Sequence, residues 1–94
     1  MSGQPGADDV PGLPEMLERF RTSRGISKSA LSKKAGLSAS YVGKLEAGHI
    51  DPSLNAFAAI ALALELTSNE VFFCVRCLFA DLRAAQESDA EGAS

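Results

Sequence analysis

The most restrictive feature of the sequence is a very short connection between two helix-forming segments. Residues 28–35 and 39–47 are rich in helix formers, and only Gly36, Leu37 and Ser38 separate them. Gly36 suits the left-handed position that ends a helix, and Ser38 suits the N-cap of the next helix. A glycine-containing turn of this length makes the second helix cross the first at a steep angle. The two helices must therefore share a small apolar core.

Apolar spacing and helix-ending residues divide the rest of the chain into helices as well. Residues 13–24 carry apolar side chains at helical spacing, and Gly25 follows them. Thr67, with Glu70 three residues later, is typical of a capping box. No segment shows the alternation of apolar and polar residues that a strand requires. The sequence therefore predicts an all-α fold with helices over 13–24, 28–35, 39–47, from Pro52 and Ser53 to about Leu64, and from Thr67 to about Ala85.

The residues expected to face the core fall into three sets. In the first helix they are Leu13, Met16, Leu17 and Phe20. Around the short turn they are Leu31, Ala35, Leu37, Val42 and Leu45. In the fourth helix they are Leu54, Phe57, Ile60, Ala61 and Leu64. Ser27 is the expected N-cap of the second helix, and Pro52 and Ser53 open the fourth.

Length and composition predict one soluble domain. We expect a body over residues 13–85 between a disordered tail over 1–12 and a disordered acidic tail over 86–94. The longest apolar run, 56–64, is too short to cross a membrane, and the first residues lack the basic segment of a secretory signal. These features favour a cytoplasmic protein with no membrane contact.

Charge is distributed unevenly along the chain. The net charge is −3, yet residues 19–49 carry seven basic residues against the single acidic residue Glu46. A basic segment inside an acidic chain indicates a cationic working face. The alternative is a solvated basic surface without a partner.

Several short motifs lie along the middle of the chain. They are Ser27, Lys28 and Leu31, Ala35 to Ser38, Tyr41 and Val42, Leu45 to Gly48, Pro52 to Leu54, Leu64 and Thr67. In this order and spacing they resemble the motifs of the lambda-repressor-like (Cro/repressor, or XRE) family of DNA-binding domains. The resemblance covers residues 20–72 and implies a five-helix helix-turn-helix domain, here with an extended C-terminal helix. It implies double-stranded DNA as the partner, with helix 39–47 in the major groove.

The resemblance also implies which side chains meet DNA. Base contacts are expected from Ala39, Ser40, Gly43 and Lys44. Contacts to the sugar–phosphate backbone are expected from Lys28, Ser38, Tyr41, Ala47, Gly48 and His49. Family members usually place long amides or arginine on this face, whereas this chain has small residues there. We therefore expect phosphate contacts and DNA shape to contribute more to recognition than base hydrogen bonds.

Arg21 and Glu46 stand where the family commonly has a partly buried ion pair between the first and third helices. Such a pair would set the angle of the recognition helix. The alternative is two solvated charges.

The fifth helix is more apolar than the core requires. On a helical wheel, Val71, Val75, Leu78 and Leu82 gather on one side, which we expect to face the core. A second stripe on the opposite side predicts a homodimer contact through Phe73, Cys77, Ala80 and Ala84. The alternative is a rotated helix that buries Phe73 within its own domain.

The sequence predicts no cofactor, metal or catalytic site. Cys74 and Cys77 form a CxxC pair, but His49 is the only other soft ligand, and zinc needs four. Both cysteines stand among large apolar residues, as packing cysteines do. No nucleophile–base pair is present, so we expect no enzyme.

These features together predict a dimeric, sequence-specific transcriptional regulator, a repressor rather than an activator, on an inverted-repeat operator. One alternative is an antitoxin that binds a toxin and represses its own operon. Another is a helix-turn-helix adaptor that binds protein instead of DNA. The alanine- and glycine-rich composition is typical of a bacterial or phage source.

Overall fold

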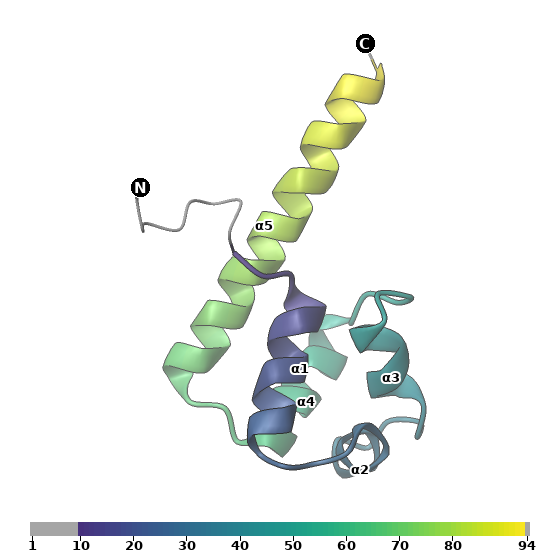
Figure 1. Cartoon of the computed structure of the whole chain (residues 1–94), viewed down its shortest axis with the longest axis vertical. Coiled ribbons are helices and arrows are strands. Elements are labelled where there is room, and N and C mark those ends of the chain that lie inside the picture. The colour runs from purple at the N-terminus through teal and green to yellow at the C-terminus, as the bar shows by residue number, and fades with distance from the viewer. Residues whose placement is uncertain (1–9, 94) are drawn as a thin grey trace.

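The structure is a computed structural model that describes residues 10–93, with side chains described to residue 87. Within this range the chain forms five helices and no strand, which confirms the all-α prediction. The helices are α1 (Leu13–Ser23), α2 (Lys28–Lys34), α3 (Tyr41–Glu46), α4 (Leu54–Leu64) and α5 (Ser68–Ala93). α1 contacts both α3 and α5, and α2 packs on α3 and α4. The far end of α5 projects beyond the other helices (Figure 1).

Most helix ends lie where the capping residues predict them. The hydroxyls of Ser27 and Ser53 accept hydrogen bonds from the amides of Ala30 and Ala56, at 3.1 and 3.0 Å. The predicted capping box is also confirmed, because the Thr67 hydroxyl accepts from the Glu70 amide and the Glu70 carboxylate accepts from the Thr67 amide. Local sequence signals therefore fix where these helices begin.

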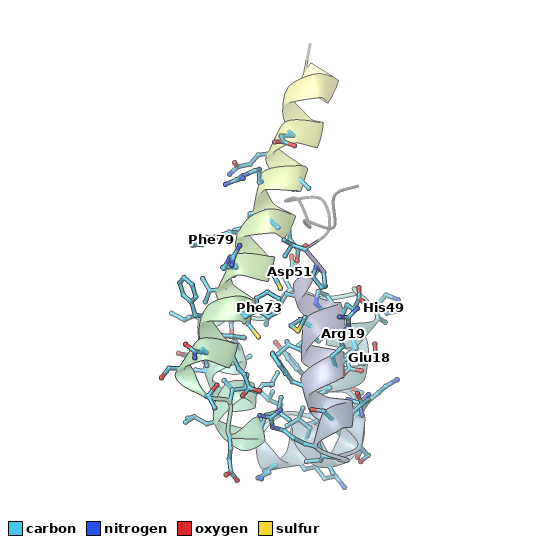
Figure 2. The ribbon with its side chains drawn as sticks, turned by 60° about the vertical axis from the view of Figure 1, so that its left-hand side comes forward. Glu18, Arg19, His49, Asp51, Phe73 and Phe79 are labelled. Atoms are coloured by element: carbon cyan, nitrogen blue, oxygen red, sulfur yellow. The ribbon has the colours of Figure 1, made fainter. Side chains whose placement is uncertain are left out.

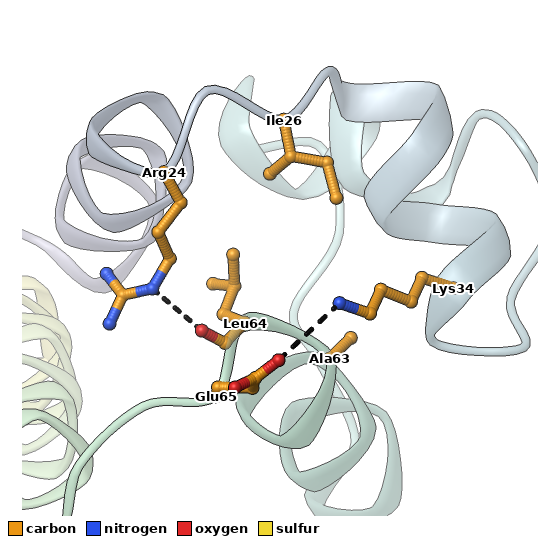
Figure 3. Close-up of a pocket in the computed structure, with 6 residues that line it drawn as sticks. All are labelled: Arg24, Ile26, Lys34, Ala63, Leu64 and Glu65. Carbon is orange, nitrogen blue, oxygen red and sulfur yellow. Dashed lines mark hydrogen bonds and ion pairs between the residues drawn. The ribbon is translucent and has the colours of Figure 1, made fainter.

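The side chain of Arg24, the residue that follows α1, satisfies the carboxyl end of α4. Arg24 Nε donates to the Leu64 carbonyl at 2.7 Å (Figure 3). The Arg24 guanidinium also pairs with Glu70 at 2.9 Å. Glu65 follows in the left-handed region with φ 58°, the only non-glycine residue with a positive φ in the described part of the chain. Lys34 lies 4.0 Å from Glu65 across the same shallow pocket. The pocket thus joins the ends of α1, α2 and α4.

The core consists mainly of the predicted residues. Leu13, Met16, Leu17, Leu31, Val42, Leu45, Ile60 and Leu64 are buried, and Phe20, Ala35, Leu37 and Phe57 pack against them. The prediction was wrong for Leu54, which is 81% exposed. Leu54 is the first residue of α4, where the helix has not yet reached the core.

The orientation of α5 differs from the prediction. Cys74 and Cys77 are fully buried and Phe73 packs against the core, so Phe73 and Cys77 are unavailable for the predicted dimer contact. Ala80 is half-buried, and Ala84 is exposed. The predicted core-facing side was also wrong, because Leu78 is 36% and Leu82 is 50% exposed. Phe79 is 60% exposed; Figure 2 labels it together with Phe73.

Polar contacts on one side of α5 accompany this orientation, and one of them is the pair of Glu70 with Arg24 described above. The Asp81 carboxylate accepts a hydrogen bond from the Leu13 amide at 3.0 Å, and so satisfies one of the free N–H groups at the start of α1. Gly12, the N-cap residue of α1, makes no side-chain cap itself. Asp81 can reach α1 only if its own side of α5 faces the domain, and Cys74 and Cys77 share that side. The larger apolar residues are turned outward as a result.

Two helix boundaries also differ from the prediction. α3 begins at Tyr41 rather than Ala39, because the Tyr41 amide bonds the Ser38 carbonyl at 3.0 Å in a turn, and the Ser38 side chain makes no cap. α5 continues to Ala93, past the predicted end near Ala85, since no glycine or proline interrupts residues 84–91.

The predicted tail over 1–12 lies outside the described residues up to position 9, and Val10 packs against the core. The division into a body and two tails stays a prediction.

None of the helices, over the part of the chain that the structure describes, is long and apolar enough to cross a membrane.

We expect both cysteines to resist thiol reagents in the folded protein. Burial raises the pKa of the Cys74 thiol from its ordinary 9.0 to about 11, and burial also raises the pKa of Cys77. At pH 8 the folded protein should therefore not react with iodoacetamide, whereas the unfolded chain should take up two equivalents, as mass spectrometry would detect. Unfolded thiols ionise at a lower pH than the buried ones, so stability should fall as the pH rises from 9 to 11. Fast labelling of the native protein would contradict this.

Candidate nucleic-acid interface

The turn between α2 and α3 holds the two helices in a fixed relation. Gly36 has φ 76°, its amide donates to the Lys33 carbonyl at 2.9 Å, and the Leu37 amide donates to the Ser32 carbonyl at 2.8 Å. This pair of bonds is a Schellman motif, which closes the end of α2 and needs a left-handed residue at position 36. Leu37 then packs against the core between the helices, as predicted.

A buried hydroxyl joins the two helices directly. Ser32 is fully buried, its Oγ donates to the Lys28 carbonyl at 2.9 Å, and it accepts from the Val42 amide at 3.0 Å. The Val42 amide is one of the free N–H groups at the start of α3, so a residue of α2 caps α3. Nothing in the sequence singles out Ser32 as a functional residue. A serine four residues after Lys28 looks like a surface position, and only the tertiary structure gives it two partners.

Replacing Ser32 with alanine should lower the free energy of unfolding by about 1–3 kcal/mol, because the Val42 amide would stay buried without an acceptor. Chemical denaturation followed by circular dichroism measures this loss. Ser29→Ala is the matched control, since Ser29 lies on the same helix but is exposed. Equal stabilities of the two variants would show that the Ser32 bond contributes nothing.

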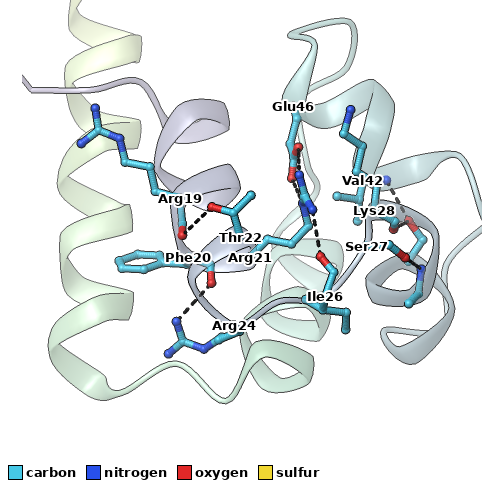
Figure 4. A network of polar contacts seen from close by, with 12 residues as sticks. Arg19, Phe20, Arg21, Thr22, Arg24, Ile26, Ser27, Lys28, Val42 and Glu46 are labelled. Atoms are coloured by element: carbon cyan, nitrogen blue, oxygen red, sulfur yellow. Dashed lines mark hydrogen bonds and ion pairs between the residues drawn. The ribbon is translucent and has the colours of Figure 1, made fainter.

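Arg21 and Glu46 form an ion pair between α1 and α3. Arg21 Nε lies 2.6 Å from Glu46 Oε2, and Nη2 donates to Oε1 at 3.0 Å (Figure 4). The third donor, Nη1, bonds the Ile26 carbonyl at 2.8 Å in the turn before α2. The side chains are only 10% and 4% exposed, and the hydrogen bond with Glu46 raises the pKa of the Arg21 guanidinium. One arginine thus ties the recognition helix to α1 and to the start of α2.

The basic residues of segment 19–49 divide into two groups. Its arginines all have acidic partners: Arg19 pairs with Glu15, Arg21 with Glu46 and Arg24 with Glu70. Its exposed lysines differ, because Lys28, Lys33 and Lys44 form no ion pair within residues 10–87. The uncompensated positive charge therefore lies on α2 and α3.

The residues predicted to meet DNA lie on or beside α3. Ala39 and Ser40 occupy the turn before it, and Gly43 and Lys44 belong to the helix. Among the predicted backbone contacts, Lys28 begins α2, Tyr41 begins α3, and Ser38, Ala47, Gly48 and His49 flank it. All ten are exposed except Gly43 and Tyr41, which are half-buried. The structure thus brings them together around one helix, beside the unpaired Lys28 and Lys44.

The geometry is that of a helix-turn-helix unit with an open second helix, and comparisons with known proteins agree. A model of the helix-turn-helix family matches residues 17–71. A crystal structure of the restriction-modification controller protein C.AhdI from Aeromonas hydrophila is similar, with 33% identity, a TM-score of 0.59, and coverage of 67% of this chain and 96% of that one. The clp gene regulator ClgR from Corynebacterium glutamicum is 26% identical, with a TM-score of 0.60 and coverage of 84% and 83%. The comparison with curated proteins gave no match.

The family match covers more than half of the chain, and this chain belongs to the XRE-type helix-turn-helix family. That family consists of DNA-binding transcriptional regulators and not of enzymes. The predicted resemblance is therefore confirmed, and the protein is a DNA-binding regulator.

Proposed function

We propose that this protein is a dimeric, sequence-specific repressor that acts in the cytoplasm on an inverted-repeat operator. The observation that carries the proposal is the open face of α3, where Lys44 and the neighbouring Lys28 are exposed and have no acidic partner in the described residues. Free cations beside a helix that projects from the domain suit the phosphates and base edges of a major groove.

Each side chain of this face has a chemical role in the proposal. Lys44 donates to the O6 and N7 atoms of guanine, Ser40 donates or accepts at a base edge, and Ala39 contacts a thymine methyl group. Lys28 donates to a phosphate from the start of α2. The contacts to the DNA backbone come from Ser38, Tyr41, Ala47, Gly48 and His49. Few long polar side chains are available, so DNA shape supplies part of the specificity.

An apolar face of α5 supports the dimer. Phe72, Leu78, Phe79 and Leu82 are 36–64% exposed on one side of the helix, and Leu54 of α4 lines a groove with Val75 and Leu78. A contiguous apolar surface of this kind is unusual on a monomer. We assign the homodimer contact to this face, in place of the stripe through Phe73 that the sequence predicts.

The regulatory role is supported by the two similar structures. One is a restriction-modification controller protein and the other is a regulator of clp genes. We assign repression because a domain bound over a promoter blocks it by occupying it.

Selection from a randomised duplex pool at about 100 mM salt tests the function, because specific binding persists at a salt concentration where phosphate contacts alone are weak. We expect an enriched inverted repeat whose half-site centres lie about 34 Å apart or a multiple of it. Enrichment of a single half-site would reject the dimer. Salt-dependent retention without enrichment would reject sequence specificity, and no retention at all would leave a protein-docking adaptor as the function.

A further inference from the structure

Gly43 is a glycine that the fold does not require. It lies inside α3, and its φ is not among the positive values that the structure has at Gly25, Gly36 and Gly48. A Cβ built at Gly43 would meet only Lys28 Cδ, at 3.9 Å, which is an ordinary van der Waals contact. Neither the backbone conformation nor the packing of the domain therefore excludes a side chain at this position.

The same glycine weakens the helix that carries it. Glycine inside a helix costs conformational entropy on folding that alanine does not. α3 has only six residues, so a poor helix former affects a large part of it. A glycine that weakens its helix and that packing does not require is explained by a molecule that binds to the domain.

The surroundings of Gly43 indicate that this molecule is DNA. Ser40 and Ala47, one turn away on either side, are exposed, and the aliphatic part of Lys28 passes beside Gly43. Gly43 is thus a half-buried position on the outer side of α3, next to the unpaired Lys28 and Lys44. The major groove is about 12 Å wide and a helix with its side chains about 10–12 Å across, so a side chain that faces the groove floor determines how deep the helix lies.

Building on the proposed DNA-binding function, we propose that Gly43 is a specificity-determining residue, at which the backbone of α3 lies directly against the base edges. The absence of a side chain lets the helix lie deep in the groove. At this depth Lys44 and Ser40 reach the bases, and Lys28 reaches a phosphate beside the same helix. A methyl group at position 43 holds the helix away from the bases and lengthens the base contacts, while the more flexible lysine contacts to phosphate adapt.

The test compares Gly43→Ala with the wild-type protein on its selected operator and on a scrambled duplex. Gly43→Ala should raise the melting temperature by about 4 °C, because alanine favours the helix. It should lower operator affinity at least about tenfold, which is the cost of one mismatched base pair. Affinity for the scrambled duplex should change less than about twofold, because phosphate contacts dominate there. Gly43→Leu, with a longer side chain, should lower operator affinity further.

Asn69→Ala is the control for stabilisation alone. Asn69 is exposed in the first turn of α5, away from α3, and alanine there also favours the helix. This variant should be stabilised and should keep wild-type operator affinity. If Gly43→Ala loses less than tenfold in operator affinity, or loses equally on both duplexes, the role of Gly43 is overturned while the DNA-binding function stands. If the wild-type protein selects no operator, the proposed function fails, and the role of Gly43 fails with it.

Discussion

Arg21→Ala should lower the free energy of unfolding by about 3 kcal/mol or more. Removing one partner of a buried ion pair leaves the other charge without compensation in a site that water barely reaches. Here the Glu46 carboxylate is 4% exposed and would lose both of its bonds to Arg21. The Ile26 carbonyl would lose its bond to Arg21 as well. Urea unfolding of the two proteins gives the difference directly.

Arg19→Ala is a matched control for this prediction. Arg19 lies on the same helix and also pairs with a glutamate, but the two side chains are 60% and 55% exposed. Exposed pairs contribute little, so its loss should cost less than about 1 kcal/mol. A double-mutant cycle with Glu46→Ala isolates the coupling energy of the buried pair. If Arg21→Ala were no more destabilising than Arg19→Ala, the pair would be without structural importance.

Phe79→Asp should convert the protein into a monomer and lower its operator affinity by about 10²–10⁴-fold. A carboxylate in the centre of an apolar contact is costly to bury, and a monomer loses the gain from binding two half-sites at once. Phe79 is 60% exposed in the single chain, so the substitution should leave the fold intact. Sedimentation velocity measures the change in mass, and circular dichroism verifies the fold.

Two further variants separate this dimer surface from the one that the sequence predicts. Leu62→Asp introduces the same charge at a leucine of α4 that is 78% exposed and outside the α5 face, and it should stay dimeric. Phe73→Asp should destabilise the fold itself, because Phe73 packs against the core. Should Phe79→Asp sediment like the wild-type protein, the dimer contact would lie elsewhere.

The sequence predicts helix ends and the helix-turn-helix core well, because these depend on neighbouring residues. Gly36 closes α2 by its own φ, and Ser27 caps a helix that starts beside it. The rotation of α5 could not be predicted in this way. Two apolar stripes with the same spacing are candidates for the core. The contacts that hold α5, among them the bond from Asp81 to an amide 68 residues earlier and the pair of Glu70 with Arg24, join residues far apart in sequence.

For the candidate site, the sequence indicates the residues around α3 but not how they are held in place. Ser32 is a serine in a short helix and carries no local signal, yet it caps α3 through the fold. The arginines of the basic segment add to the positive charge that the sequence shows there, and the structure uses them in ion pairs. The partners of Ser32 and of the arginines determine these roles. Local sequence patterns do not show which residues those partners are.

The contacts at the two ends of α1 have a consequence for the length of the operator. Near its C-terminal end, Arg21 fixes α1 to the recognition helix, and at its N-terminal end the Leu13 amide is fixed to Asp81 of α5. In the proposed dimer, α1 is therefore a rigid link that fixes the distance between the recognition helix α3 and the dimer axis at α5. One extra base pair between the half-sites shifts them by about 3.4 Å and rotates them by about 34°. Because both ends of α1 are held by contacts, the distance between the two recognition helices cannot adjust to such a change. The spacing of the half-sites therefore identifies the operator as strictly as their sequence does.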